Sequence, residues 1–484
     1  MSISSALSSA LSGLTANARA AEVVSSNVAN ALTEGYARRE LGLSTRSLGG
    51  EGAGVKIEGV SRVLNRSVLA DRRLADAAAG NAALRQQFYT RLEQSIGTAD
   101  QPGSLTARMD DLESALISAA SRPDSEARLQ EVLDSATGLA GTINAVSDDL
   151  QATRMAADQE IAAQVAALND ALTRIDELNA TILTQRGVGS DATALMDQRQ
   201  LLVDRVSAIV PVREVMRDKD QISLYTTGGA VLLEGNPARI GFSAVGVITP
   251  DMTQTSGALS GLTLNEVPIR STEDGVLGGG TLAALFAVRD ELAVSAQSQL
   301  DAVARDLIGR FAAPGVDPTL APGAPGLFTD SGAAFDPLDE VGLGARLEVS
   351  ALADPAQGGA LWRLRDGLGA AAPGDVGSAA ILQALAGAMG APQVPASGSF
   401  LGAARSASGL AADLLSQVSA ARQSADDSSA FTGARQATLA VALASDGVDT
   451  DAELQNMLLI EQSFAANARV ITALDEMIQQ ILGM

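Results

Sequence analysis

The sequence predicts a mainly α-helical, elongated rod with a β-rich insertion. Stretches with helical hydrophobic periodicity lie at both ends of the 484-residue chain, and the period changes to alternation near its centre. Aromatic residues make up only 3% of the chain, which favours helix–helix contacts between small side chains over a bulky core. We expect N- and C-terminal helices paired as a coiled coil, a long helical bundle, and a distal domain of α+β or β type.

The last segment, 447–484, carries the clearest helical pattern. Thr450 followed by Glu453 predicts a capping box at the start of a helix. Two apolar rows then recur at heptad spacing, with Asn467 as the one polar member: Met457, Ile460, Phe464, Ile471, Leu474, Ile478 and Ile481. A narrow seam of this kind needs a partner helix.

The first segment, 1–32, has a second and weaker seam. Its members alternate at spacings of four and three: Leu7, Leu11, Leu14, Ala18, Ala21, Ser25, Val28 and Leu32. Its many serines lower the intrinsic helicity, so we expect packing against the C-terminal seam to order this helix. The stretch Thr33–Tyr36 should end the helix, because Gly35 suits a left-handed backbone position.

The residues between the two seams predict a bundle and an insertion. Helices are expected at 62–96, 105–119, 124–185, 191–210, 281–311 and 403–444. The region 124–185 can be one very long helix or two helices with a break. Residues 37–60 read as extended, and alternation predicts strands at 212–216, 221–226 and 230–233.

These patterns divide the chain into four expected parts. They are a terminal coiled-coil domain (1–36 and 450–484), a helical bundle (37–210, 280–311 and 402–449), a β-rich subdomain (211–279) and an irregular, Pro- and Gly-rich outer domain (312–401). The nesting predicts a rod whose base contains both chain ends and whose tip is an insertion.

Composition excludes several classes of function. The net charge of −23 argues against a nucleic-acid groove, which needs clustered positive charge. The absence of Cys and His removes the usual zinc sites, the Ser/His and Cys/His nucleophile pairs and the commonest general base. We therefore expect no enzymatic activity, no cofactor and no metal. An acidic cluster at 446–453 departs from the EF-hand pattern and is explained by helix capping.

Targeting signals of the ordinary kinds are not expected. The N-terminal segment has no basic region before Arg19 and no compact apolar core, so we do not expect a secretory signal peptide. No run of about 18 apolar residues occurs, so we expect no membrane insertion.

Three asparagines lie in or beside the seams. Asn27, Asn30 and Asn467 can be ordinary polar positions on helices, or buried residues that set register and partner choice at a cost in stability. Their positions leave both interpretations open.

Motifs at both ends of the chain resemble the bacterial flagellar axial proteins, the group of rod, hook and hook-associated proteins. The N-terminal motif is Ser12–Leu14 with Ala16, followed by Ser26–Asn30 and Thr33–Arg38. The C-terminal motif is Phe464–Ile471 with Asp475–Met477. Three interior stretches are similar to a hook-associated protein of the hook–filament junction: Gly54–Asn65, Asp197–Asp204 and Gly228–Gly235.

The resemblance implies a secreted, extracellular structural protein of the flagellum on which the filament is built. It implies export through the flagellar type III apparatus with a chaperone at the C-terminal helix. The implied partners are further copies of the chain, hook protein and the second junction protein. Alternatives are another axial protein, either the second junction protein or hook protein, and a ligand-binding or enzymatic module in 312–401.

The seams and the two terminal motifs together predict an assembly interface. Its expected members are Leu7, Leu11, Leu14, Asn27, Val28, Asn30, Gly35, Tyr36, Met457, Ile460, Phe464, Asn467, Arg469, Ile471, Leu474, Ile478 and Ile481.

Overall fold

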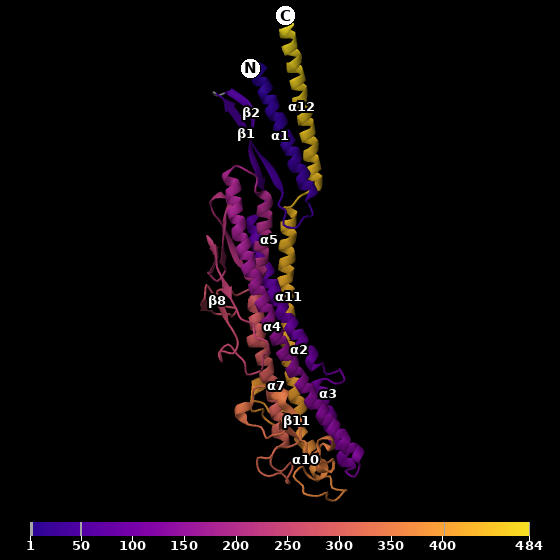
Figure 1. The fold of residues 1–484 in the computed structure, drawn as a ribbon. Helices are drawn as coiled ribbons and strands as arrows, with labels where there is room; N and C mark the ends of the chain where they lie inside the picture. The colour runs from indigo at the N-terminus through magenta and orange to yellow at the C-terminus, as the bar shows by residue number, and fades with distance from the viewer. Residues whose placement is uncertain (1–2, 49–50, 401, 484) are drawn as a thin grey trace.

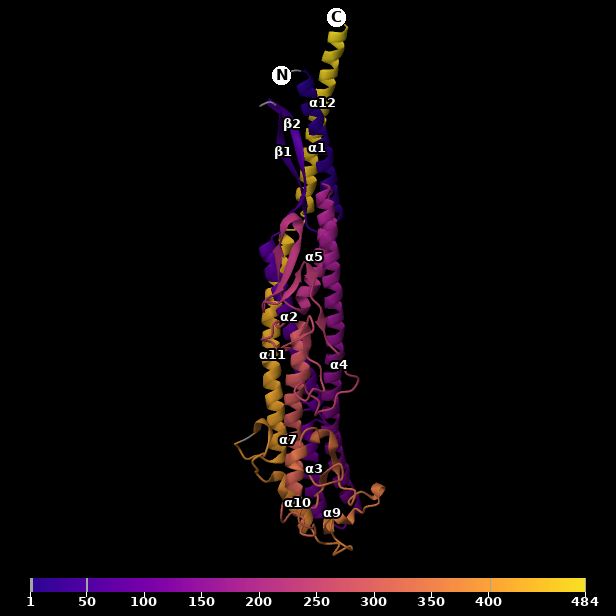
Figure 2. The ribbon, with the colours of Figure 1, turned by 60° about the vertical axis from the view of Figure 1, so that its left-hand side comes forward.

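The protein is a long rod with both chain ends at one end of it (Figures 1 and 2). This computed structural model describes residues 3–48, 51–400 and 402–483. Helices dominate, and the described strands form four small sheets. The predicted fold class, a mainly helical rod with a β-rich insertion, is confirmed.

The two terminal helices run antiparallel and side by side at the base of the rod. They are α1 (Ile3–Ala29) and α12 (Thr450–Leu482), and α12 projects beyond the start of α1 in both views (Figures 1 and 2). The carboxylate of Asp449 caps α12 by accepting the backbone N–H groups of Asp451 and Ala452 at 3.0 and 3.1 Å. The predicted capping box is therefore wrong: Thr450 is already helical, and Glu453 turns towards α1.

A β-hairpin lies along α1 (Figure 1). Its strands, β1 (Arg39–Leu48) and β2 (Glu51–Arg62), pair antiparallel with Arg39 opposite Arg62. The Ser12 hydroxyl accepts the backbone N–H of Val55 at 3.0 Å, and a Cβ at Gly54 would lie 2.1 Å from Ser12 Oγ. We expected residues 37–62 in the bundle, but this close approach joins most of the hairpin to the terminal helix.

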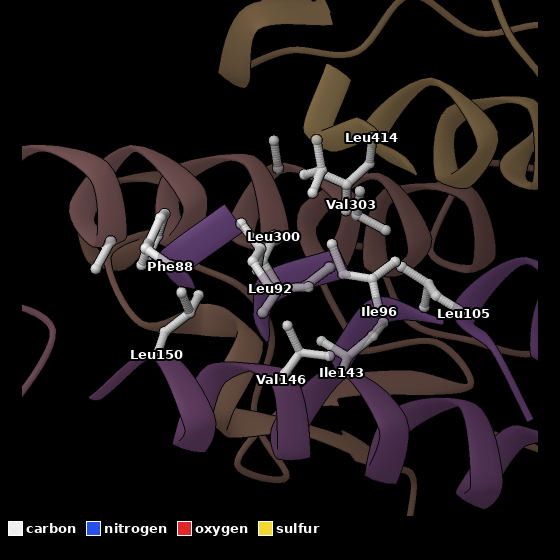
Figure 3. Packing of buried hydrophobic residues seen from close by; sticks show 14 of the residues in the cluster. Phe88, Leu92, Ile96, Leu105, Ile143, Val146, Leu150, Leu300, Val303 and Leu414 are labelled. Atoms are coloured by element: carbon white, nitrogen blue, oxygen red, sulfur yellow. The ribbon is translucent and has the colours of Figure 1, made fainter. Parts of the chain in front are cut away.

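Long helices form the bundle in the middle of the rod. They are α2 (Arg66–Ile96), α3 (Leu105–Ser121), α4 (Glu126–Gly187), α5 (Thr193–Ile209), α7 (Ala293–Phe311) and α11 (Ala407–Ser445). Helix α4 is one uninterrupted element of 62 residues, about 93 Å long at 1.5 Å per residue. Leucine, isoleucine, valine and phenylalanine from α2, α3, α4, α7 and α11 meet in its interior (Figure 3).

The β-rich insertion covers one side of the bundle (Figure 1). One sheet has the order β3 (Val212–Met216), β4 (Ile222–Thr226), β5 (Val231–Glu234) and β6 (Asn236–Pro237); the other joins β7 (Ile240–Gly241), β8 (Leu262–Leu264) and β9 (Val267–Ile269). All of these pairings are antiparallel.

A buried arginine pair fastens this insertion to the bundle. Helix α6 (Thr281–Ala287) continues through a π-helical turn, Val288–Leu292, into α7. Arg289 of that turn is fully buried and pairs with Asp158 of α4 at 2.5 Å. Arg154 of α4 donates to the carbonyls of Thr249 and Met252 at 3.1 and 2.6 Å. Guanidinium donors thus satisfy loop carbonyls that would otherwise be buried without partners.

Short elements make up the end of the rod farthest from the termini (Figure 2). They are the pair β10 (Phe328–Asp330) and β11 (Leu347–Val349), the helices α8 (Leu343–Arg346), α9 (Trp362–Asp366) and α10 (Ala380–Gly390), and 3-10 turns at Pro337–Asp339, Pro355–Gln357 and Gly398–Phe400. The buried Arg310 of α7 binds the carbonyls of Ala388 and Ala391 at 2.9 and 2.5 Å. This region is therefore anchored on the bundle.

Truncation inside the bundle should be costly. We expect Ile143→Ala, at a side chain that is 0% exposed, to lower the free energy of unfolding by about 2–5 kcal/mol because it removes packed atoms and leaves a cavity. The matched control is Ile117→Ala, at a position that is 57% exposed, with an expected change within about 0.5 kcal/mol. Urea unfolding followed by circular dichroism measures both, and equal losses would contradict the assigned core.

Candidate assembly interface

Helix α12 turns most of its predicted seam towards α1. Leu474 is buried, and Met457, Ile460, Asn467, Ile471 and Ile478 are half-buried, whereas Phe464 and Ile481 are exposed. Asn467 lies over Gly13 of α1, where a Cβ would be 2.8 Å from its Nδ2 atom. One turn further along α1, Asn17 Nδ2 donates to the Ser463 hydroxyl at 3.0 Å.

Helix α1 meets its neighbours through small residues. Its buried positions are Ala10, Ala16, Val23, Val24 and Asn27, whereas Leu7, Leu11 and Leu32 are 37%, 58% and 101% exposed. Leu14 and Val28 are half-buried. The two terminal helices pack on each other, but Leu7 and Leu11 of the expected row stay exposed, and the contact with α12 includes Gly13 beside Asn467 and Asn17 beside Ser463.

Apolar rows therefore stay exposed on both terminal helices. Besides the leucines of α1, the exposed side chains of α12 include Leu454, Leu458, Leu459, Val470, Met477 and Leu482. Leu459, Val470 and Met477 follow one another at spacings of eleven and seven, which places them on one face of the helix. That face flanks the seam packed on α1.

The amide of Asn27 organises the joint where α1 ends. Asn27 is 1% exposed. Its Nδ2 donates to the Arg39 carbonyl at 2.9 Å and to Glu453 Oε1 at 3.0 Å. Its Oδ1 accepts the Tyr36 hydroxyl and the Arg39 backbone N–H, both at 2.9 Å. One side chain thus uses its full hydrogen-bonding capacity to join α1, the following turn, β1 and α12.

The other two asparagines have different surroundings. Asn30 donates to the Ser26 carbonyl at 2.9 Å and accepts the Thr33 hydroxyl at 3.3 Å, so its bonds serve only the end of α1. Asn467 is half-buried in the contact with Gly13. Burial and bonding to α12 therefore single out Asn27 as the asparagine placed to set register.

Asp197 of α5 connects this joint to the bundle. It pairs with Arg62 at 2.8 Å and Arg39 at 3.2 Å, and accepts the backbone N–H of Ala37 at 3.4 Å. Burial raises the pKa of Asp197 against the effect of both arginines, and burial lowers the pKa of Arg62. Burial disfavours the charged forms of both Asp197 and Arg62, so these ion pairs add little to the net free energy of folding. We assign them mainly to fixing the orientation of the hairpin relative to α5.

Gly35 lets the turn reach α5. Its φ of +77° lies in the left-handed region, and a Cβ there would be 2.6 Å from Leu201 Cγ. The predicted end of the N-terminal helix before the turn at Thr33–Tyr36 is confirmed, since α1 ends at Ala29. The Arg39 guanidinium lies over the Tyr36 ring, 4.8 Å from the ring centroid.

Sequence reasoning missed several residues of this joint. Glu453 was assigned to a cap, and it is instead 3% exposed with Arg38 Nη1 3.8 Å from its Oε1. Asp197 was noted only within a motif, and Gly13 had no recognised partner. Arg469, an expected member of the interface, is exposed and has no hydrogen bond or ion pair within the described residues.

Metal sites and membrane spans are two further classes of functional feature. Within 3–48, 51–400 and 402–483, no group of three or more acidic side chains is arranged to hold a metal ion. No helix in those ranges is both long enough and apolar enough to cross a membrane.

Loss of the Asn27 amide should loosen the joint. We expect Asn27→Ala to cost about 1–3 kcal/mol, because it leaves the Glu453 carboxylate and the Arg39 backbone groups without these partners. Amide exchange at Arg39 and in the first turns of α12 should accelerate, as read by mass spectrometry. Asn30→Ala is the matched control, with α12 unchanged; similar exchange in the two variants would refute the assignment.

Comparisons with known proteins match three separate stretches of the chain. Residues 89–314 match the family model "Flagellar hook-associated protein FlgK helical domain". Residues 7–36 match "Flagella basal body rod protein", and residues 442–484 match "Flagellar basal body rod FlgEFG protein C-terminal". The two terminal matches enclose the joint, and the central match contains α3 to α7.

The similar proteins include flagellar hook-associated protein 1 from several bacteria. Flagellar hook-associated protein 1 of Salmonella typhimurium (strain LT2) is 27% identical over 284 residues, covering 57% of this chain and 51% of the relative. The protein of the same name from Bacillus subtilis (strain 168) is 25% identical over 240 residues, covering 47% of each. The chain spans about half the length of the curated relatives it matches.

A solved structure is also similar in part. The flagellar hook junction protein FlgK from Burkholderia pseudomallei aligns with a TM-score of 0.44 and 18% identity, covering 54% of this chain and 46% of that one. The family models and the named relatives carry the assignment without it. Rod-protein models match both ends of the chain and the FlgK helical-domain model matches the stretch between them, so the chain is similar to flagellar hook-associated protein 1 in the order of its segments.

Proposed function

We propose that this protein is a self-assembling structural adaptor at the hook–filament junction of the bacterial flagellum, with no enzymatic activity. The observation that carries the proposal is the pair of terminal helices, packed on each other through small residues while apolar rows on both remain exposed. Similarity to named relatives suggests the biological setting, since those relatives are hook-associated proteins.

Exposed apolar rows favour polymerisation of the terminal helices. On α1, Leu7 and Leu11 are 37% and 58% exposed. On α12, Leu459 is 62% exposed, and Val470 and Met477 continue the same face. Burial of apolar surface contributes about 25 cal/mol per Å², so copies packed side by side would stabilise one another through these rows. The predicted interface residues that already pack within the chain, including Asn27, Gly35 and Leu474, would then shape each subunit for this contact.

Rigid attachment of the terminal helices supports an adaptor role. Asn27 and Asp197 tie α1, the hairpin, α12 and α5 into one joint, so an orientation set in the polymer passes directly to the bundle. The proposed neighbours are hook protein on one side and the second junction protein on the other, and the filament is built on this layer.

Export is part of the same proposal. The protein reaches the extracellular end of the hook unfolded, through the flagellar type III apparatus. A chaperone at α12 would cover Leu459, Val470 and Met477 before assembly, since these side chains are exposed on the free helix.

Two alternatives differ in what supports them. Another axial protein, either hook protein or the second junction protein, shares the terminal motifs, but the FlgK helical domain over 89–314 favours the junction role. A ligand-binding or enzymatic module in 312–401 has less support. The cavity described there, between Phe311 and Leu385, measures about 10 Å³, against several hundred Å³ for typical ligand sites.

Removing the protein tests the junction role. In a motile bacterium that carries this gene, a null mutant should make complete hooks without filaments and release filament subunits into the medium. Electron microscopy of the cells and immunoblotting of the medium measure the two effects, and the intact gene should restore filaments. Normal filaments in the null mutant would refute the proposal, and absent hooks would favour a hook-protein role.

Charging the exposed row of α1 tests the interface itself. We expect Leu11→Glu to change the free energy of unfolding of the free chain by no more than about 0.5 kcal/mol, because Leu11 is exposed. The variant should nevertheless fail to join hooks, since assembly would bury the new carboxylate. The matched control is Leu338→Glu in the outer region, at a residue 92% exposed, which should assemble normally. Incorporation of Leu11→Glu at the wild-type level would remove this row from the interface.

A further inference from the structure

An arginine-rich cavity lies where the hairpin strand β2 meets α2, α5 and the strands β3 and β4. Its volume is about 540 Å³. Five arginines line it against three carboxylates, those of Glu58, Glu214 and Asp220. The arginines are Arg62, Arg66, Arg73, Arg186 and Arg199. Such a concentration of guanidinium groups is unexpected in a chain of net charge −23.

Arg73 of α2 keeps one buried donor without a partner. Its side chain is 3% exposed, with Nε 2.6 Å from Asp204 Oδ1 and Nη1 2.6 Å from Glu214 Oε2. Its Nη2 atom is buried and has no hydrogen-bond acceptor among the described residues. A buried N–H without a partner costs about 1–3 kcal/mol, so an acceptor entering the cavity would recover that free energy.

Arg199 of α5 is held by uncharged acceptors. It is 4% exposed, and its Nη1 donates to Asn179 Oδ1 and to the Asp220 carbonyl, both at 2.7 Å. Burial lowers its pKa to about 10 against the effect of the nearby Glu214 and Asp220 carboxylates, and the positive charge of Arg62 acts in the same direction as burial. A buried cation without a directly bound carboxylate is stabilised by any anion that reaches it.

Arg66 stands at the first position of α2, on the wall of the cavity. It is exposed and has no hydrogen bond or ion pair within the described part of the chain. Asp220 also lines the cavity, and the turn at Lys219 and Asp220 has φ values of +56° and +61°. Non-glycine residues rarely adopt this conformation, and such strain gathers at binding sites. Here it brings the Asp220 carbonyl to Arg199 and its carboxylate to Arg186 at 2.7 Å.

We propose that this cavity binds an oxyanion through Arg66, Arg73 and Arg199. Guanidinium groups bind carboxylate and phosphate oxygens through parallel N–H donors, which suits both kinds of anion. The anion comes either from solution or from an acidic side chain of a second copy. This site is independent of where in the flagellum the protein assembles.

The test uses the full-length protein and inorganic phosphate. We expect the thermal midpoint of unfolding to rise saturably with sodium phosphate, beyond the effect of sodium chloride at equal ionic strength and pH. Arg66→Gln should weaken the apparent phosphate affinity about five-fold, because it removes one partly solvated charge contact. Arg66 has no partner to lose, so this variant keeps the fold.

Arg435→Gln is the matched control. Arg435 is an exposed arginine of α11, also without a hydrogen bond or ion pair within the described residues, and it lies outside the cavity. Its replacement removes the same charge and should leave the phosphate effect unchanged. The proposal is overturned if phosphate has no effect beyond ionic strength, or if Arg66→Gln and Arg435→Gln respond alike.

Sedimentation velocity then identifies the source of the anion. If the cavity accepts a carboxylate from a second copy, both phosphate and Arg66→Gln should weaken self-association measured in chloride, while Arg435→Gln should not. The other outcome is that self-association is equal for the unmodified protein in chloride, the unmodified protein in phosphate, and the Arg66→Gln and Arg435→Gln variants in chloride. If phosphate still stabilises the chain through Arg66 in that case, the ligand is a free oxyanion.

Discussion

The buried amide of Asn27 is the contact on which the arrangement of the terminal helices depends. Four hydrogen bonds from one side chain join the end of α1 to the following turn, to β1 and to Glu453 of α12. Those segments lie up to 426 positions apart in the chain. Replacing the amide would leave a carboxylate and backbone groups buried without these partners, so the joint has little freedom to adopt another register.

Charge burial extends the same constraint from the joint to the bundle. Asp197 forms ion pairs with Arg39 of β1 and Arg62 of β2. Burial disfavours the charged form of both Asp197 and Arg62. Farther along the rod, Arg154 and Arg289 fix the β insertion, and Arg310 fixes the outer region. Arginine thus links one segment to the next throughout a chain with few aromatic residues, because its planar donors can satisfy several carbonyls at once.

Much of the fold could be predicted from local patterns. The helix expected at 105–119 is Leu105–Ser121, and the strand expected at 212–216 is Val212–Met216. The interface was harder to predict, because heptad spacing shows which residues share a face and not which face meets a partner. The large leucines of α1 seemed the natural contact. Gly13 packs against Asn467 of α12 instead, and Leu7 and Leu11 stay exposed.

The sequence by itself determined the helical rod, the nesting of the β insertion and the two terminal segments that resemble the flagellar axial proteins. These follow from residue spacing and local backbone preference, which act over a few residues. Only the tertiary structure decided that Glu453 leaves its expected cap to meet Asn27, and that Arg66, Arg73 and Arg199 line one cavity. Those groups come from segments distant in the chain, and only packing brings them together.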